Sequence, residues 1–276
     1  MTFGVSAVVV LSLSLAGFVA TSYFEKHLRA AIGRNQFLLA SEVANEIDSK
    51  LLMAQQQLVM AARDVPATAL RDTEVAQRFL DRKAYLAGFF DNHFTMCSAA
   101  GIAIAEEPFA PGRRGRDYSY RPYFKETVAT KKPAISDPYI SSQAHGHPAI
   151  MLTAPIFDRD GSLAGFLAGS MDLMGDNVLG DIAKIKVGRH GYLSLTTADR
   201  VMVMHPDKSR IMKPIPAGNA LYDAALAGFE GTGDTVTTGG IPMVTSFKRK
   251  CSSRGRTTRC TASRKAERAA TCSTAT

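Results

Sequence analysis

Apolar residues recur with helical spacing over residues 25–67, and polar residues fill the positions between them. No proline interrupts this stretch before Pro66. The pattern predicts one long amphipathic helix, assigned here to residues 25–73. Such a helix can cover a sheet and can make a dimer contact that transmits a signal; the two roles are compatible, and spacing does not separate them. The apolar positions are Leu28, Ile32, Leu39, Val43, Ile47, Leu51, Leu58 and Ala62.

Beyond residue 74 a shorter helix is predicted over 74–86, and the apolar period then changes to two, which is typical of strands. Three hairpins follow, and two of them resemble each other at an offset of 99 residues. This resemblance indicates two tandem copies of an α/β module, or else a chance match of hairpins. Adjacent antiparallel strands flanked by helices give an α+β fold. The predicted strand pairs are 94–97 with 102–105, 150–157 with 163–171, and 193–196 with 201–204.

An uncharged stretch at residues 4–23 precedes the long helix. Twenty helical residues span roughly 30 Å, the thickness of a bilayer core, so the stretch predicts an N-terminal transmembrane anchor over 1–24. The alternative is a cleaved signal peptide, although no basic residue precedes the apolar stretch. Either alternative places the rest of the chain outside the cytoplasm.

The formal charge of +8 belongs to the C-terminal end of the chain. Nine of the 33 basic and one of the 25 acidic residues lie at 248–276, which leaves 24 of each over 1–247. A nucleic-acid-binding fold should carry basic charge on a folded face, so no nucleic-acid partner is expected.

Residues 248–276 also contain three of the four cysteines and hardly any large apolar residue, so they are predicted to be a disordered basic tail. A basic arm for membranes or nucleic acid is one interpretation of this tail. We favour another, in which a frameshift replaced the native continuation of the chain.

The chemistry of the chain is concentrated at residues 117–124, DYSYRPYF, where four aromatic residues surround Arg121. A guanidinium binds a carboxylate through two parallel hydrogen bonds, and aromatic faces pack ligand carbons or a cation. If Asp172 converged on the same cavity, the pair would bind the carboxylate and the ammonium of an amino acid. Alternatively, Arg121 pairs internally with Asp117 or Asp137.

Catalytic and metal-binding patterns are weaker. His145 and His147 lack a third ligand in the sequence, so neither a metal nor a cofactor is predicted. The sequence contains no nucleophile-elbow, Walker or zinc-protease pattern.

Several motifs, in order, resemble the double-Cache (PAS-like) extracytoplasmic sensor domains of bacterial chemoreceptors, histidine kinases and diguanylate cyclases. The resemblance covers about residues 25–247. The motifs are YRPYF at 120–124, ISDPY at 135–139, LTAPI at 152–156, DGSLAG at 160–165, GSMDL at 169–173, and GYL at 191–193 followed by HPD at 205–207.

The resemblance implies a membrane-distal module at 74–173 that holds the ligand, and an incomplete membrane-proximal module at 174–247. It implies that Arg121 and Tyr123 bind a carboxylate and that Asp172 binds an amino group, with Tyr118 and Tyr139 as pocket walls. Amino-acid sensors of this family usually have tryptophan where this chain has Tyr123, and tyrosine where it has Arg116. A small organic acid therefore fits as well as an amino-acid-like ligand.

The expected function is a non-enzymatic sensor region at the bacterial inner membrane, facing the periplasm or the exterior and dimerising through the long helix. The alternatives are an exported enzyme that uses the same cavity, and a truncated product that does not signal.

Overall fold

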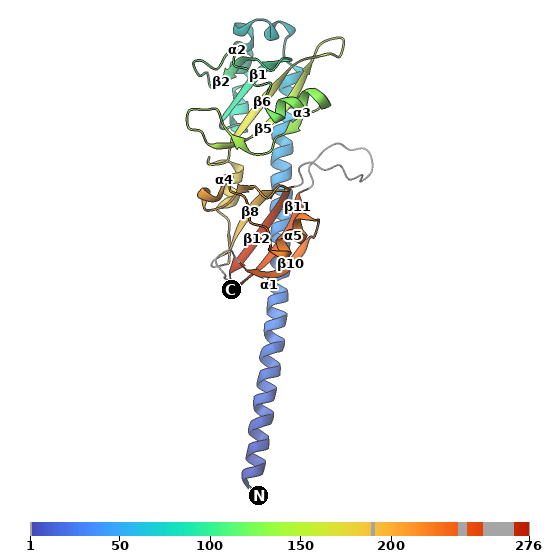
Figure 1. Ribbon diagram of the computed structural model, residues 1–276, viewed down its shortest axis with the longest axis vertical. Helices are drawn as coiled ribbons and strands as arrows, with labels where there is room; N and C mark the ends of the chain where they lie inside the picture. The colour runs from blue at the N-terminus through green and yellow to red at the C-terminus, as the bar shows by residue number, and fades with distance from the viewer. Residues whose placement is uncertain (1, 189–190, 237–241, 251–267, 276) are drawn as a thin grey trace.

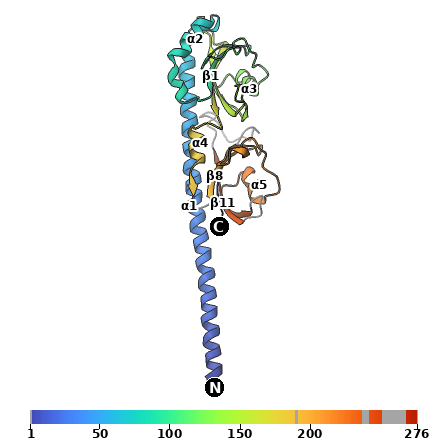
Figure 2. The ribbon, with the colours of Figure 1, turned by 90° about the vertical axis from the view of Figure 1, so that its left-hand side faces the viewer.

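The computed structural model describes residues 2–188, 191–236, 242–250 and 268–275. One long helix, α1 (Thr2–Arg63), forms the axis of the molecule. Two antiparallel sheets lie along its C-terminal half, one beyond the other (Figures 1 and 2). We call them the distal module, which includes the C-terminal end of α1, and the proximal module, which lies nearer the middle of the helix.

The predicted amphipathic helix is confirmed, but α1 begins at Thr2 and ends at Arg63. Its apolar stripe is buried only from about Gly33 onward, where the modules cover it. Leu28 remains 48% exposed and Ile32 36% exposed. Successive helical turns therefore contribute to the cores of both modules. The buried positions on this face are Ala40, Val43, Ala44, Ile47, Leu51, Ala54, Leu58, Ala61 and Ala62.

The transmembrane anchor predicted over residues 1–24 is not confirmed. In the part of the chain that the structure describes, no helix combines the length and the hydrophobicity that a membrane crossing requires. The burial of side chains 1–9 lies outside that description.

The distal module is a six-stranded sheet in the order β2-β1-β6-β5-β3, with β4 paired to β5. Two of the predicted hairpins, β1 with β2 and β5 with β6, form four of its six strands. Helix α1 packs on one face of the sheet and α3 on the other (Figure 2). The elements are η1 (Ala67–Leu70), α2 (Thr73–Arg82), η2 (Ala84–Gly88), β1 (His93–Ser98), β2 (Ala103–Glu107), α3 (Pro122–Thr130), β3 (Ala134–Ile135), β4 (Tyr139–Ile140), β5 (Pro148–Phe157) and β6 (Leu163–Asp172).

The proximal module repeats this design. Its sheet has the order β10-β11-β12-β8-β7, and β9 pairs with β8, which confirms the third hairpin. Strands β9-β8-β12-β11-β10 follow one another as β2-β1-β6-β5-β3 do, so the tandem interpretation is correct. The elements are α4 (Val178–Ala183), β7 (Lys186–Val187), β8 (Gly191–Thr197), β9 (Met202–Met204), η3 (Lys208–Arg210), α5 (Ala220–Leu226), β10 (Gly231–Val236), β11 (Pro242–Lys250) and β12 (Arg268–Ala275).

The predicted disordered tail is wrong for two parts of 248–276. Strand β11 continues to Lys250, and β12 lies between β11 and β8 in the middle of the proximal sheet. Backbone hydrogen bonds to a neighbour on each side hold β12, and such bonds do not require large apolar side chains. The proximal module therefore includes residues beyond 247, and the sequence estimate failed because it considered only side-chain composition. Residues 251–267 lie outside the described part of the chain.

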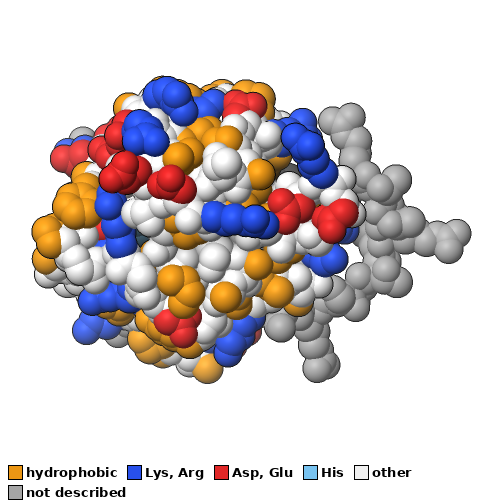
Figure 3. Space-filling model, turned by 90° about the horizontal axis from the view of Figure 1, so that it is seen from above, with side chains coloured by type: hydrophobic (Ala, Val, Ile, Leu, Met, Phe, Trp, Pro, Cys, Tyr) orange, Lys and Arg blue, Asp and Glu red, His pale blue; other side chains and the backbone are white. Residues whose placement is uncertain are grey.

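The distal sheet separates two cores. On the α1 side, Phe94 and Met96 join the larger apolar cluster. On the α3 side, a smaller and more polar cluster contains Tyr118, Tyr123 and Phe166. Viewed from the distal end, basic, acidic and apolar side chains are interspersed, and this face shows no broad patch of one sign (Figure 3).

Candidate ligand-binding site

A small cavity lies in the α3-side core of the distal module. Alternation along β1 directs His93, Thr95 and Cys97 toward it, while the residues between them face α1. The other lining residues come from the segment before α3, from α3 itself and from β4 to β6; they are Arg113, Tyr118, Arg121, Tyr123, Tyr139, Ser142, Met151 and Ala168.

Arg121 is fixed at the start of α3. It is the N-cap residue of that helix, and Pro122 follows at the first helical position, where its missing N–H costs nothing. The backbone N–H of Arg121 donates to the carbonyl of Tyr118 at 3.0 Å. A hydrogen bond of 2.6 Å between the hydroxyls of Thr127 and Thr153 then ties α3 to β5. The helix start thus places Arg121 and Tyr123 over the sheet.

Gly101 allows the segment before α3 to lie against the first hairpin. Its φ of +88° is left-handed, and a Cβ atom there would lie 2.9 Å from the backbone nitrogen of Ser119. We expect Gly101→Ala to lower the free energy of unfolding by roughly 1–3 kcal/mol and to weaken ligand binding, because the segment must shift. Urea unfolding followed by circular dichroism measures the first effect.

The matched control is Gly112→Ala. Gly112 also has a positive φ, of +78°, but a Cβ there meets nothing within 4 Å. Gly112→Ala should lower the free energy of unfolding through backbone strain alone and leave ligand binding unchanged. Equal effects of the two substitutions on binding would contradict the role given to Gly101.

Four of the five predicted site residues, Tyr118, Arg121, Tyr123 and Tyr139, line the cavity together. Asp172, at the end of β6, is not among the lining residues. Sequence reasoning missed Arg113 and His93; Arg116, which stands where the family usually has tyrosine, is exposed. The one signal in the sequence was the alternation of β1, which puts a histidine at an inward position.

Arg121 carries a charge that no internal acid neutralises. Among the described residues no carboxylate lies within ion-pair distance of it, so the alternative of a pair with Asp117 or Asp137 is wrong. Asp117 instead accepts a hydrogen bond from the backbone of Ser119. The guanidinium lies 5.1 Å from the ring centre of Tyr120 and 5.0 Å from that of Tyr139. Aromatic faces stabilise the cation and leave its N–H groups available.

Arg113, by contrast, is already neutralised. Its Nε lies 2.8 Å from a carboxylate oxygen of Glu106, and both side chains are almost fully buried. Its Nη2 also lies 3.3 Å from the hydroxyl of Tyr118 and 3.3 Å from Nε2 of His93. The cavity therefore holds two guanidinium groups, and of these Arg121 is the one without an anionic partner among the described residues.

Five polar atoms of the cavity-lining residues have no hydrogen-bond partner among the described residues: Nε of Arg121, Nδ1 of His93, Oγ1 of Thr95, and Nε and Nη1 of Arg113. The charge of Arg113 is nevertheless balanced by its ion pair with Glu106. Burial, with Arg113 nearby, lowers the pKa of His93 to about 3, so its imidazole is neutral. Arg113 donates to Nε2, and the proton of His93 is therefore on Nδ1. Apart from the ion-paired Arg113, two N–H donors and one hydroxyl thus lack partners, which is costly in a buried site and suits an acceptor-rich ligand.

Cys97 and His93 share the cavity, which raises the possibility of cysteine catalysis. A nucleophilic cysteine needs its thiolate form, usually beside a cationic histidine. Burial raises the pKa of the Cys97 thiol well above its ordinary value and lowers that of His93. Both shifts disfavour the reactive ion pair, so the cavity is better suited to binding than to catalysis.

Asp172 lies next to the cavity in a separate polar cluster. One carboxylate oxygen is 2.7 Å from Nδ1 of His147, and the other accepts the backbone N–H of Met174. Nε2 of His145 lies 3.1 Å from Oδ1 of Asn92. An amino group bound to Asp172 would share this carboxylate with His147 and the backbone N–H of Met174.

The cavity is narrow. It measures about 10 Å³, roughly enough for one water molecule. A ligand with several heavy atoms must therefore widen it, so bound and free states differ in the packing of these side chains.

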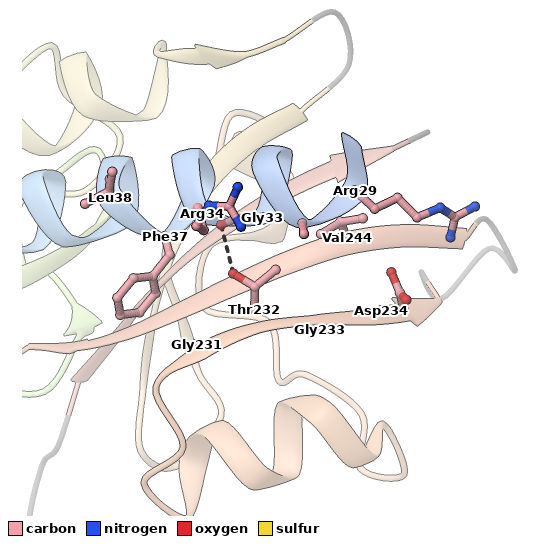
Figure 4. A pocket seen from close by; sticks show the side chains of 11 residues that line it. Arg29, Gly33, Arg34, Phe37, Leu38, Gly231, Thr232, Gly233, Asp234 and Val244 are labelled. Atoms are coloured by element: carbon pink, nitrogen blue, oxygen red, sulfur yellow. Dashed lines mark hydrogen bonds between the residues drawn. The ribbon is translucent and has the colours of Figure 1, made fainter. Parts of the chain in front are cut away.

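A larger groove of about 620 Å³ lies in the proximal module, between α1 and strands β10 and β11 (Figure 4). There Thr232 donates to the carbonyl of Gly33 at 2.9 Å, and a Cβ at Gly33 would lie 2.7 Å from the methyl of Thr232. The hydroxyl of Thr232 also lies 2.7 Å from that of Ser246. These groups join α1 to the sheet and are already paired, so the distal cavity is the stronger candidate.

Known proteins share both sequence and fold with the chain. The Cache domain family model matches residues 21–250. The methyl-accepting chemotaxis protein McpA of Pseudomonas putida is 23% identical over 211 residues, which cover 75% of this chain and 31% of that protein. The chain thus spans about a third of the length of this relative.

The solved structures that match include ligand-binding domains of chemoreceptors. That of Pseudomonas fluorescens CtaA with L-isoleucine has a TM-score of 0.67 at 18% identity, covering 91% of this chain and 94% of that one. That of Pseudomonas aeruginosa PctC with GABA has a TM-score of 0.65 at 18% identity, covering 88% and 99%. At this identity the likeness concerns the fold. The family match extends over most of the chain, and the protein therefore belongs to the Cache domain family, in its double-Cache form.

Proposed function

We propose that the chain is the extracytoplasmic ligand-sensing region of a bacterial signalling receptor of the chemoreceptor type. Its ligand is a small carboxylate or an amino-acid-like molecule, bound in the distal cavity. The observation that carries this proposal is Arg121, a cavity-lining guanidinium with no carboxylate partner among the described residues.

The unpaired donors suit a carboxylate. Nε of Arg121 and Nδ1 of His93 can each donate a hydrogen bond to a carboxylate oxygen, and the hydroxyl of Thr95 can donate a third. Tyr118, Tyr123 and Tyr139 form apolar walls for the rest of the ligand. Burial raises the pKa values of Tyr123 and Tyr139, so neither phenol ionises at neutral pH to repel an anion.

An amino-acid-like ligand would also place its ammonium on Asp172, as the family resemblance implies. It would then compete with His147 for that carboxylate. A carboxylate without an amino group avoids this competition. The comparison between an amino acid and its deaminated analogue therefore measures the contribution of Asp172.

Signalling requires two packings of the modules that bind the ligand with different affinity. Helix α1 packs on both sheets, so a change in the distal cavity can alter how the helix sits against the proximal module. Its N-terminal half exposes large apolar side chains, including Phe18 and Phe24, and supports a homodimer through α1.

A thermal-shift screen of the full chain tests the proposal. The panel consists of L-amino acids, their deaminated analogues, mono- and dicarboxylates, and simple amines. We expect at least one carboxylate-bearing compound to raise the melting temperature in proportion to the logarithm of its concentration, and simple amines to have no effect. Stabilisation by amines alone, or by no carboxylate at millimolar concentration, would contradict it.

A further inference from the structure

The strongest feature that the ligand proposal leaves unused is the cluster of His145, His147 and Asp172. One ligand atom from each residue lies within 4.8 Å of those of the other two. The histidines come from the loop between β4 and β5, and the acid from the end of β6. Pairing of β5 with β6 brings them together, since Ala149 lies opposite Asp172. The sequence supplied two candidate ligands, and the fold adds the third.

We propose that these three side chains form a site for a divalent transition metal of the zinc type. Two imidazoles and one carboxylate are a donor set that Zn²⁺ accepts, with a fourth position open to water or another ligand. The imidazole rings of His145 and His147 lie 4.3 Å apart between centroids. Nδ1 of His147 is 2.7 Å from Asp172, so a small shift would admit a metal between them.

Asn92 orients one of the proposed metal ligands, His145, through a hydrogen bond. Nδ1 of His145 accepts the backbone N–H of His147 at 2.9 Å, so its proton is on Nε2, which donates to Oδ1 of Asn92 at 3.1 Å. A hydrogen bond from one ring nitrogen typically orients the other toward a metal. On binding, the metal would replace the backbone N–H at Nδ1.

Asn92 also links the cluster to the ligand cavity. Its Nδ2 donates to the hydroxyls of Ser141 at 3.2 Å and Ser170 at 2.9 Å. The hydroxyl of Ser170 lies 3.2 Å from that of Tyr139, whose ring packs beside Arg121. A metal would withdraw Asp172 from any ligand ammonium, so it should favour ligands that carry a carboxylate and no amino group.

Titration of the full chain with zinc sulfate, by calorimetry after removal of trace metal with EDTA, tests the site. We expect one equivalent to bind with micromolar or tighter affinity. His147→Gln and Asp172→Asn should weaken it at least 10-fold, because each removes a ligand. The matched control, His27→Gln, changes an exposed histidine on α1 and should bind as the parent does.

Two further measurements separate the site from other zinc binding. Cobalt(II) in place of zinc should give visible bands without a thiolate charge-transfer band, because no cysteine belongs to the donor set. Arg121→Ala should lose the carboxylate response and keep the metal, which makes the two proposals independent. Affinity weaker than millimolar, a thiolate band, or binding that persists in both His147→Gln and Asp172→Asn would overturn the assignment.

Discussion

Arg121→Ala is expected to abolish the thermal response to the carboxylate that stabilises the parent most. A guanidinium that binds a carboxylate through two hydrogen bonds contributes roughly 3 kcal/mol, so the loss is about 100-fold in affinity. Arg121→Lys keeps the charge and loses the planar guanidinium, so its affinity for the carboxylate should lie between those of the parent and of Arg121→Ala. Calorimetric titration with that carboxylate measures both.

The fold should tolerate this change. Arg121 has no carboxylate partner among the described residues, and its contacts with Tyr120 and Tyr139 are modest in energy. We therefore expect the free energy of unfolding to change by less than about 1 kcal/mol. Arg116→Ala is the matched control, because Arg116 is exposed nearby on the same segment and should leave affinity unchanged. A response of Arg121→Ala equal to that of the parent would contradict the pocket assignment.

Arg113→Met is expected to have the largest effect on stability, lowering the free energy of unfolding by about 3–5 kcal/mol. The substitution leaves the Glu106 carboxylate buried without its cation. Burial already raises the pKa of Glu106, and loss of Arg113 raises it further. The protonated acid is neutral and costs less to bury, so the loss should be greater at neutral than at acidic pH. Urea unfolding followed by circular dichroism at two pH values measures this, since the chain contains no tryptophan.

The double substitution Arg113→Met with Glu106→Leu tests whether the unpaired carboxylate of Glu106 causes the loss of stability. An apolar pair of similar volume is often no less stable than a buried ion pair, so more than half of the lost stability should return. If the double variant were as unstable as the single one, the unpaired carboxylate would not be the cause.

Periodicity predicted where the helices and strands of this fold lie, but it predicted less well how they pack together. Alternation placed all three hairpins, and helical spacing placed α1 and α2, because one buried face dictates each pattern. It failed at β12, whose pairing rests on backbone hydrogen bonds that composition does not record. Periodicity also did not predict that Leu28 and Ile32 stay exposed, because an apolar stripe has the same spacing whether or not a module covers it.

Within the candidate site, the sequence motifs predicted Tyr139 and three further residues that lie close together in the chain. Tyr118, Arg121 and Tyr123 belong to one motif, and they do meet in the cavity. Arg113 and His93 were missed because β1 and the segment before α3 meet only in the folded sheet. The sequence likewise did not predict that Asp172 lies beside the two histidines, because the pairing of β5 with β6 brings them together.

The central claim is that a carboxylate binds at Arg121 in the distal cavity. The most direct measurement is a crystal structure of the full chain with the carboxylate that gives the largest thermal shift. We expect the carboxylate oxygens to accept hydrogen bonds from Arg121 and from Nδ1 of His93, in a cavity wider than that of the unliganded chain. A carboxylate bound instead in the groove between α1 and β10, or elsewhere in the proximal module, would contradict it.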